Sequence, residues 1–185
     1  MDLTTGKLGA QDVAKATGTT PKQITDWCNQ GHIVGQKTPL GKGRRREFTF
    51  SNVMEISGAV ALMEIGLTTP GDAFRASSHF AHIGSGHSGW VNEEGDIVED
   101  PPRPSRWPGL PYHFREGETF LVVSGQLSEV VLSEKGKIDT RRVFPMHRNP
   151  VGLILLNMTE VFKTVVARMD TGSTWAQILN EVYGH

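Results

Sequence analysis

The sequence has very little cysteine and no long apolar segment. Cys28 is the only cysteine among 185 residues, so a disulfide within the chain and a metal site built from several thiolates are both excluded. No apolar run approaches the roughly 18–20 residues that span a membrane, and the first residues lack the charged-then-apolar pattern of a secretory signal. We therefore expect a cytoplasmic protein with no membrane partner.

An excess of charge of one sign is also missing. The formal net charge is −1, so the chain as a whole shows no electrostatic preference for nucleic acid. The cations are unevenly placed, however, because residues 37–46 carry five Lys and Arg and no acid. The field of such a patch reaches roughly 10 Å at ordinary salt whatever the total charge. Its role therefore depends on the elements that flank it.

Motifs of catalysis and metal binding are absent or incomplete. We find no nucleophile motif, phosphate-binding loop or catalytic carboxylate pair, and Glu116 and Glu118 fit turn chemistry better. His79, His82 and His87 lie close in sequence, and the first two share a helix face. No carboxylate or cysteine nearby completes a convincing zinc set, and a surface or packing role is the simpler interpretation. We expect no enzymatic activity, no metal and no cofactor.

Two short helices with a tight turn are predicted near the N-terminus. The first covers residues 8–18 and ends at Gly18, a residue suited to the left-handed conformation that follows a helix. Thr20 then fits an N-cap, Pro21 the first helical position, and Gln23 the third residue of a capping box. The apolar side chains of the second helix recur three and four residues apart, at Ile24, Trp27 and Cys28. This order is typical of a helix-turn-helix.

A basic hairpin is predicted to follow. Residues 33–34 and 48–50 can pair as short strands around a turn at 41–43. The segment "GRRREFTF" would then form a wing, with Lys42 to Arg46 directed outward and Phe48 and Phe50 directed into the core. The alternative is a solvated loop that only promotes solubility.

Two further helices are predicted over 52–67 and 68–84. Ser51 is expected to cap the first, and Gly66 to end it. The apolar face of the second is formed by small and aromatic residues: Ala73, Phe74, Ser77, Phe80 and Ala81.

The remainder divides into an irregular segment and a patterned one. Gly, Pro and acidic residues dominate 84–118, which we interpret as a linker or as an irregular entry to a second unit. Strands are expected in "TFLVVSG", "QLSEVVLSEKG", "KIDTRRVF" and "VGLILLN", with turns at Ser124–Gly125 and Lys135–Gly136. Asn157 and Ser173 are expected to cap two final helices. The prediction is an α+β protein with a DNA-binding domain over 1–83, a linker over 84–118 and a small α+β unit over 119–185.

The N-terminal pattern resembles the DNA-binding domain of the MerR family of transcriptional regulators. Four segments account for the resemblance, and they occur in the same order as in the family: "LGAQDVAKATGTTPKQITDW", "QGHI", "RRREFTFSNVMEI" and "LMEIGLTTPGDAF". The resemblance implies a winged helix-turn-helix, pseudo-palindromic promoter sites and a homodimer. It covers a little over a third of the chain. Thr25 and Asp26 stand where the family commonly has Arg and Tyr, and no heptad run follows residue 84 to form the family's coiled coil.

The predicted DNA contacts come from the second helix and the wing. The start of a recognition helix faces the major groove, where Gln pairs with adenine and Lys with guanine or phosphate. Arginine in a wing binds phosphate oxygens with its forked donors. Asp26 would repel DNA unless it pairs with a neighbour such as Lys22. The predicted contact residues are Thr20, Lys22, Gln23, Thr25, Lys42, Arg44, Arg45 and Arg46.

Two other functions remain open at this point. The same DNA-binding module occurs in phage excisionases and small terminase subunits, which are architectural or packaging proteins. Alternatively, residues 110–185 could form a pocket for a small molecule or metal. Under the favoured hypothesis this C-terminal unit provides dimerisation, because a single short recognition helix binds DNA weakly. RNA polymerase is a further candidate partner.

Overall fold

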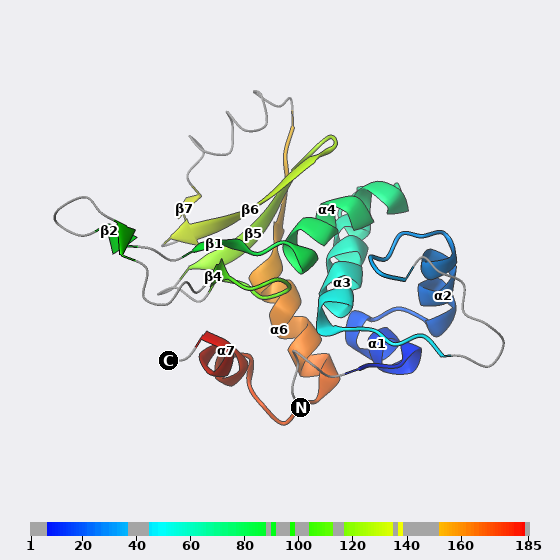
Figure 1. Cartoon of the computed structure of the whole chain (residues 1–185). Coiled ribbons are helices and arrows are strands. Elements are labelled where there is room, and N and C mark those ends of the chain that lie inside the picture. The colour runs from blue at the N-terminus through cyan, green and yellow to red at the C-terminus, as the bar shows by residue number, and fades with distance from the viewer. Residues whose placement is uncertain are drawn as a thin grey trace.

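The computed structural model describes residues 7–36, 45–87, 90–91, 97–98, 104–112, 117–134, 137–138 and 152–183. The N-terminal helices gather at one end of the molecule and an antiparallel sheet lies towards the other (Figure 1). The described helices are α1 (Ala10–Thr17), α2 (Pro21–Asn29), α3 (Phe50–Glu64), α4 (Pro70–His82), α6 (Met158–Met169) and α7 (Trp175–Tyr183). The mixed helix-and-sheet class predicted from the sequence is confirmed. No described helix combines the length and apolar character needed to cross a membrane.

The described strands form one four-stranded sheet and two strand pairs, all antiparallel. The sheet has the order β7-β6-β5-β8. Its strands are β5 (Glu118–Ser124), β6 (Leu127–Glu134), β7 (Lys137–Ile138) and β8 (Ile154–Asn157). The pairs join β1 (Ser85–His87) to β4 (Pro104–Arg106) and β2 (Trp90–Val91) to β3 (Ile97–Val98).

The β5–β6 hairpin follows the predicted pattern. Ser124 pairs with Leu127 across a turn at Gly125 and Gln126, as the Ser124–Gly125 signal indicated. Leu121 of β5 lies opposite Val130 of β6 and Leu156 of β8, so one face of the sheet is apolar. The second predicted turn, at Lys135–Gly136, lies outside the described residues, and the strand expected after it is described only as β7.

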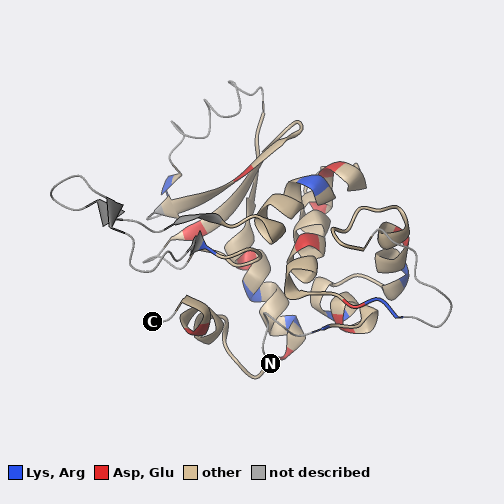
Figure 2. Cartoon of the chain, in the orientation of Figure 1, with Lys and Arg blue, Asp and Glu red and all other residues tan. Residues whose placement is uncertain are grey.

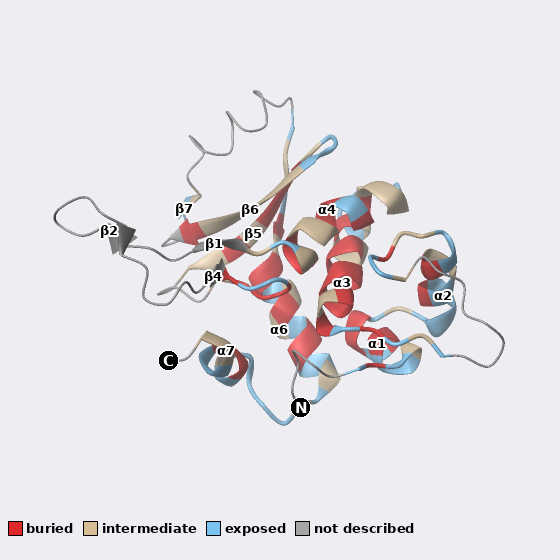
Figure 3. Ribbon diagram, in the orientation of Figure 1, coloured by how far each residue is buried: buried red, intermediate tan, exposed pale blue. Residues whose placement is uncertain are grey.

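One hydrophobic core extends from the N-terminal helices to the sheet. Most of α3 is buried, and it lies at the centre of the molecule (Figure 3). Helix α6 contacts α1, α3 and β5, so it joins the helical end to the sheet. Phe50 of α3 and Phe162 of α6 meet edge to face, with ring centroids 6.0 Å apart. The segments over 1–83 and 119–185, which the sequence suggested as separate units, thus both contribute to this core.

The turn between α1 and α2 lies directly against α6. Gly18 has φ 72°, the left-handed conformation predicted for it. A Cβ at this position would lie 2.8 Å from Nη1 of Arg168, near the end of α6. The backbone conformation therefore favours glycine here, because a residue with a Cβ is strained at this φ.

Two predicted helix caps were wrong by one or two residues. Thr49, rather than Ser51, caps α3, and Thr174, rather than Ser173, precedes α7. Each of these threonines accepts from the backbone N–H three residues on, and the amide side chain there accepts from the threonine N–H in return. Ser51 and Ser173 have Met54 and Ala176 at the matching position, so neither serine can form such a reciprocal pair.

The cap predicted for α6 is confirmed. Oδ1 of Asn157 accepts from the backbone N–H of Glu160 at 3.2 Å. The apolar face of this helix is buried at Phe162, Val165 and Val166. The strand β8 leads directly into this cap, which explains how the sheet and α6 come to share the core.

Residues 106–111, expected within a linker, pack against the end of α4. Arg106 is only 1 % exposed. Its guanidinium donates to the carbonyls of Phe80 at 2.9 Å and of Ile83, and lies 4.9 Å from the centroid of the Phe80 ring. Burial lowers the pKa of this guanidinium, because a charged group loses its hydration there. The segment is therefore a fixed part of the fold near the end of α4.

Candidate nucleic-acid interface

The start of α2 is held by the predicted capping box. Oγ1 of Thr20 accepts from the backbone N–H of Gln23 at 3.2 Å, and Oε1 of Gln23 accepts from the N–H of Thr20 at 3.0 Å. Pro21 occupies the first helical position. This first turn is exposed, so local chemistry alone presents Thr20, Lys22 and Gln23 to the solvent.

An ion pair runs along the exposed face of α2. Nζ of Lys22 lies 2.8 Å from Oδ2 of Asp26, one helical turn away. The hydrogen bond to this carboxylate and its negative charge raise the pKa of Lys22. The pairing suggested for Asp26 from the sequence is thereby confirmed. Thr25, also exposed, donates its hydroxyl to the carbonyl of Pro21 at 2.8 Å.

The opposite side of α2 is buried, where it packs beside α1 and meets α4 through one aromatic contact. Ile24 and Cys28 are fully buried, as the apolar spacing predicted. Trp27 meets Phe74 edge to face, with centroids 5.1 Å apart. Burial raises the pKa of the Cys28 thiol, so this cysteine is a small apolar core residue rather than a reactive one. The contacts determine which side of α2 remains exposed.

The predicted pairing of residues 33–34 with 48–50 was wrong. Phe48 instead forms a bridge with Leu8, with two backbone N–H to O distances of 2.9 Å. Phe50 already belongs to α3, and the Ile33–Val34 segment forms a turn. The expectation that Phe48 and Phe50 face the core is confirmed, since both are at most 6 % exposed.

A buried carboxylate explains why Val34 does not enter a strand. Both carboxylate oxygens of Glu55 accept from the backbone N–H of Val34 at 3.2 Å. Nδ2 of Asn52 donates to the Val34 carbonyl at 3.0 Å, so both backbone groups of Val34 bind side chains of α3. Oε2 of Glu55 also lies 3.0 Å from Nε2 of His82 at the end of α4. Three segments therefore converge on one fully buried side chain.

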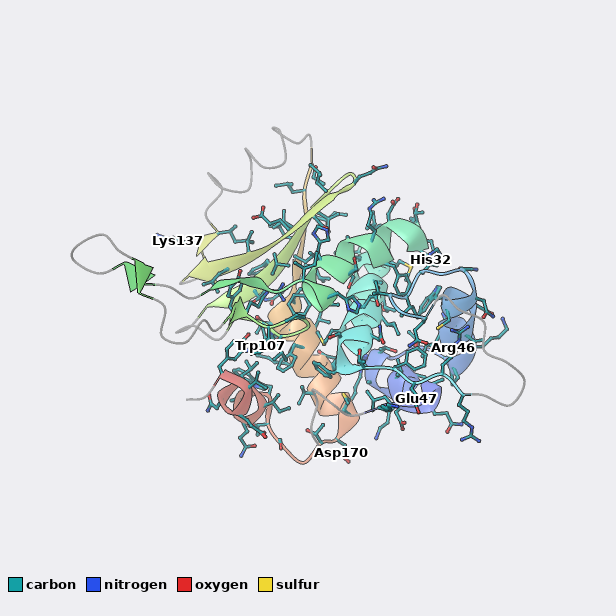
Figure 4. The ribbon with its side chains drawn as sticks, viewed as in Figure 1. His32, Arg46, Glu47, Trp107, Lys137 and Asp170 are labelled. Atoms are coloured by element: carbon teal, nitrogen blue, oxygen red, sulfur yellow. The ribbon has the colours of Figure 1, made fainter. Side chains whose placement is uncertain are left out.

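Hydrogen bonds from long side chains join the two ends of the basic segment, at residues 36 and 46–47. Nε2 of Gln36 donates to the carbonyl of Glu47 at 2.7 Å. Arg46 donates in return to the carbonyl of Gln36, and its other Nη donates to Oδ1 of Asn29 at 3.1 Å. These contacts join the chain before residue 37 to the chain after residue 44 and to the end of α2. Arg46 and Glu47 lie between α1 and α2 (Figure 4).

The charges at this end of the molecule are of both signs (Figure 2). Arg45 is exposed. Lys7 pairs with Glu47, with 2.6 Å between Nζ and Oε2. Of the predicted wing residues, Lys42 and Arg44 lie outside the described residues, as does the turn at 41–43. Of the remaining two, Arg45 faces solvent and Arg46 holds the base of the segment.

The histidines considered for metal binding do not form a described cluster. His82 contacts Glu55, and His79 lies on the same helix. The side chain of His87 is outside the described part. Among the side chains that the structure describes, no three of His, Cys, Asp and Glu are placed to hold a metal ion.

Sequence reasoning missed Glu55, Asn52, Gln36 and Asn29. Only Glu55 carried a usable signal, because an acid between Met54 and Ile56 in an apolar helix is expected to have a buried partner. The other three are ordinary polar residues, and the contacts that matter here join them to Glu47, Arg46 and Val34, which lie 11 to 18 positions away in the chain. Comparison with known proteins adds no assignment, since no family model and no curated protein sequence matches this chain.

Proposed function

We propose that this chain is a sequence-specific regulator of transcription that binds double-stranded DNA as a MerR-like winged helix-turn-helix. The first turn of α2 would enter the major groove, with Lys22, Gln23 and Thr25 towards the bases. The observation that carries the proposal is the arrangement of α2. Its apolar side is buried beside α1, with Trp27 against Phe74 of α4, while its capped, polar first turn faces outward. A recognition helix requires both properties.

The segment after α2 supports the same proposal. Arg45 is exposed, and it lies next to the hydrogen bonds by which Gln36 and Arg46 join the chain before residue 37 to the chain after residue 44. Lys42 and Arg44 belong to the same basic run of the sequence. Phosphate contacts from a wing supply much of the affinity of such domains and make it depend on salt.

A homodimer completes the proposal. Helix α2 has nine residues, about 14 Å of helix, so one copy reads only a few base pairs. Two copies related by a two-fold axis would read a pseudo-palindromic site with half-sites about one helical turn apart. RNA polymerase would be the further partner at a promoter.

Genome-wide mapping of DNA bound by the full chain tests this function. We expect enrichment of short, two-fold symmetric sites at promoters, and binding to the recovered duplex should weaken steeply with salt. Enrichment at recombination or packaging sites would indicate an architectural protein of the excisionase or terminase type. An absence of any enriched duplex, together with no salt-dependent binding in a purified titration, would refute DNA binding itself.

A further inference from the structure

A second site lies at the first turn of α3 and includes no residue of α2. A cleft of about 210 Å³ separates the first turn of α3 from the turn that follows β4 and from α7. Phe50 and Ser51 line it from α3, Trp107 and Leu110 from the turn, and Ile178 and Val182 from α7. The cleft thus joins three segments that are far apart in the sequence.

Hydrogen bonds fix the turn and α7 relative to each other. The hydroxyl of Tyr183, at the end of α7, donates to the carbonyl of Pro111 at 2.8 Å. The backbone N–H of Trp107 donates to the same hydroxyl oxygen at 3.2 Å. One phenol therefore ties α7 to both ends of the turn that forms the opposite wall.

The turn is equally fixed on its other side. The buried Arg106 guanidinium donates to the carbonyls of Phe80 and Leu110, and the N–H of Gly109 donates to Phe80 at 3.0 Å. Gly109 has φ 76°, and a Cβ there would approach Ser51 Oγ to 3.4 Å. The walls are therefore held in place by the protein itself, which favours a preformed binding site.

The lining of the cleft is apolar and uncharged. Phe50, Leu110 and Ile178 are nearly fully buried beneath it, whereas the Trp107 side chain is 43 % exposed beside it. Thr49 and Ser51 add hydroxyl groups on the α3 side. No Lys, Arg, Asp, Glu or His is among its lining residues, so a charged ligand would lose hydration without gaining a partner.

The volume decides the size of the occupant. An apolar cavity of about 150 Å³ is large enough for benzene. A cleft of about 210 Å³ therefore suits a single ring with a short substituent, or a fused pair of small rings. A helix or strand of another protein would not fit into it. Two aromatic side chains, Phe50 and Trp107, offer ring faces or edges for such a molecule.

We propose that this cleft binds a small uncharged aromatic molecule, of the size of indole or 2-phenylethanol. The site lies between α7 and the start of α3, so it is not formed by the C-terminal segment alone. It goes beyond DNA binding and does not depend on it.

Titration of the full chain with indole and with 2-phenylethanol, followed by amide and indole N–H resonances, tests the site. We expect saturable shifts at Trp107, Leu110 and Ile178, with Kd below about 1 mM for at least one probe. Resonances of α2 serve as an internal reference, because α2 does not line the cleft. No DNA is present, so failure here leaves the proposed DNA binding standing.

A filling substitution supplies the decisive control. Val182→Phe should occupy the cleft and weaken probe binding by about tenfold or more. Val161→Phe is the matched variant, since Val161 is also a partly buried valine packed against the core but does not line the cleft. It should leave Kd unchanged within about twofold. Both variants are first checked for a native-like spectrum, and Val182→Ile serves instead if Val182→Phe does not fold.

Three results would overturn the proposal. One is the absence of saturable shifts with either probe. Another is equal probe binding by the natural chain and a folded cleft-filling variant. The third is that dilution without any probe shifts the same resonances, which would assign the cleft to a contact between two copies of the chain.

Discussion

The two halves of the proposed DNA interface are built in different ways. The first turn of α2 is specified by neighbours in the sequence, since Thr20, Pro21 and Gln23 form its cap among themselves. The base of the arginine-bearing segment is specified by distant residues, namely Glu55 for Val34, and Asn29 for Arg46. One half of the proposed interface is therefore a local motif, whereas the other half forms only in the folded chain.

This difference predicts different sensitivities to mutation. A mutation in the capped first turn of α2 should lower the free energy of unfolding by the contribution of one helix cap, because the rest of α2 is held by its buried face. A mutation of Glu55 should destabilise several elements at once, because this side chain connects α3, α4 and the turn after α2. Four predictions follow this contrast, beginning with the largest effect.

Glu55→Ala should lower the free energy of unfolding by about 3 kcal/mol, because the N–H of Val34 and the side chains of Asn52 and His82 lose their hydrogen bonds to this fully buried carboxylate. Urea denaturation followed by tryptophan fluorescence measures the change. Glu64→Ala, an exposed acid on the same helix, should change stability by less than about 0.5 kcal/mol. Equal losses of stability in the two variants would show that the contacts of Glu55 do not stabilise the fold more than an exposed acid does.

Arg46→Ala and Arg45→Ala should distinguish two roles. Arg46 stabilises the fold through its hydrogen bonds, whereas Arg45 binds DNA phosphate under the proposed function. Arg46→Ala should cost about 1–2 kcal/mol of stability, since its guanidinium binds the Gln36 carbonyl and Asn29. Arg45→Ala should leave stability unchanged within about 0.5 kcal/mol and lower the salt slope of DNA binding by about 0.9. Fluorescence anisotropy at several salt concentrations on the mapped duplex gives the slopes. If Arg46→Ala is as stable as the natural chain, its assigned role is wrong.

Thr49→Ala should lower stability by about 1 kcal/mol through loss of the α3 N-cap. Ser51→Ala is the matched variant, because Ser51 was the cap expected from the sequence, and it should change stability by less than about 0.5 kcal/mol. Thermal unfolding by circular dichroism distinguishes them. The reverse order would show that the reciprocal Thr49–Asn52 pair contributes little.

Asp26→Asn should have the smallest effect on stability and should tighten DNA binding by about twofold to fivefold, because Lys22 would lose its acidic partner near the phosphates. Asp72→Asn removes a comparable ion pair, with Arg75 on α4, and should leave DNA affinity unchanged. Anisotropy at low salt measures both. Unchanged affinity in Asp26→Asn would place Lys22 away from the DNA.

The apolar cleft also combines residues that the sequence identifies with contacts that form only in the folded chain. Its aromatic and aliphatic lining residues are recognisable in the sequence only as core candidates. Arg106, which fixes one wall, lay in a stretch rich in Pro and acid that suggested a linker. Nothing local indicates that an arginine in such a stretch is 1 % exposed, because its partners are backbone carbonyls of another helix.

Local sequence patterns were enough to predict the α1–turn–α2 unit, the β5–β6 hairpin, the cap of α6 and the inward direction of Phe48 and Phe50. Each depends on residues within four positions of one another or on a simple apolar period. Contacts between distant parts of the chain set three other features: Val34 binds Glu55 instead of a strand, Arg46 binds Gln36 and Asn29, and the C-terminal sheet and α6 share the core of the N-terminal helices. Those outcomes depend on which distant polar group is buried beside which backbone atom, and that pairing is set by packing rather than by local preference.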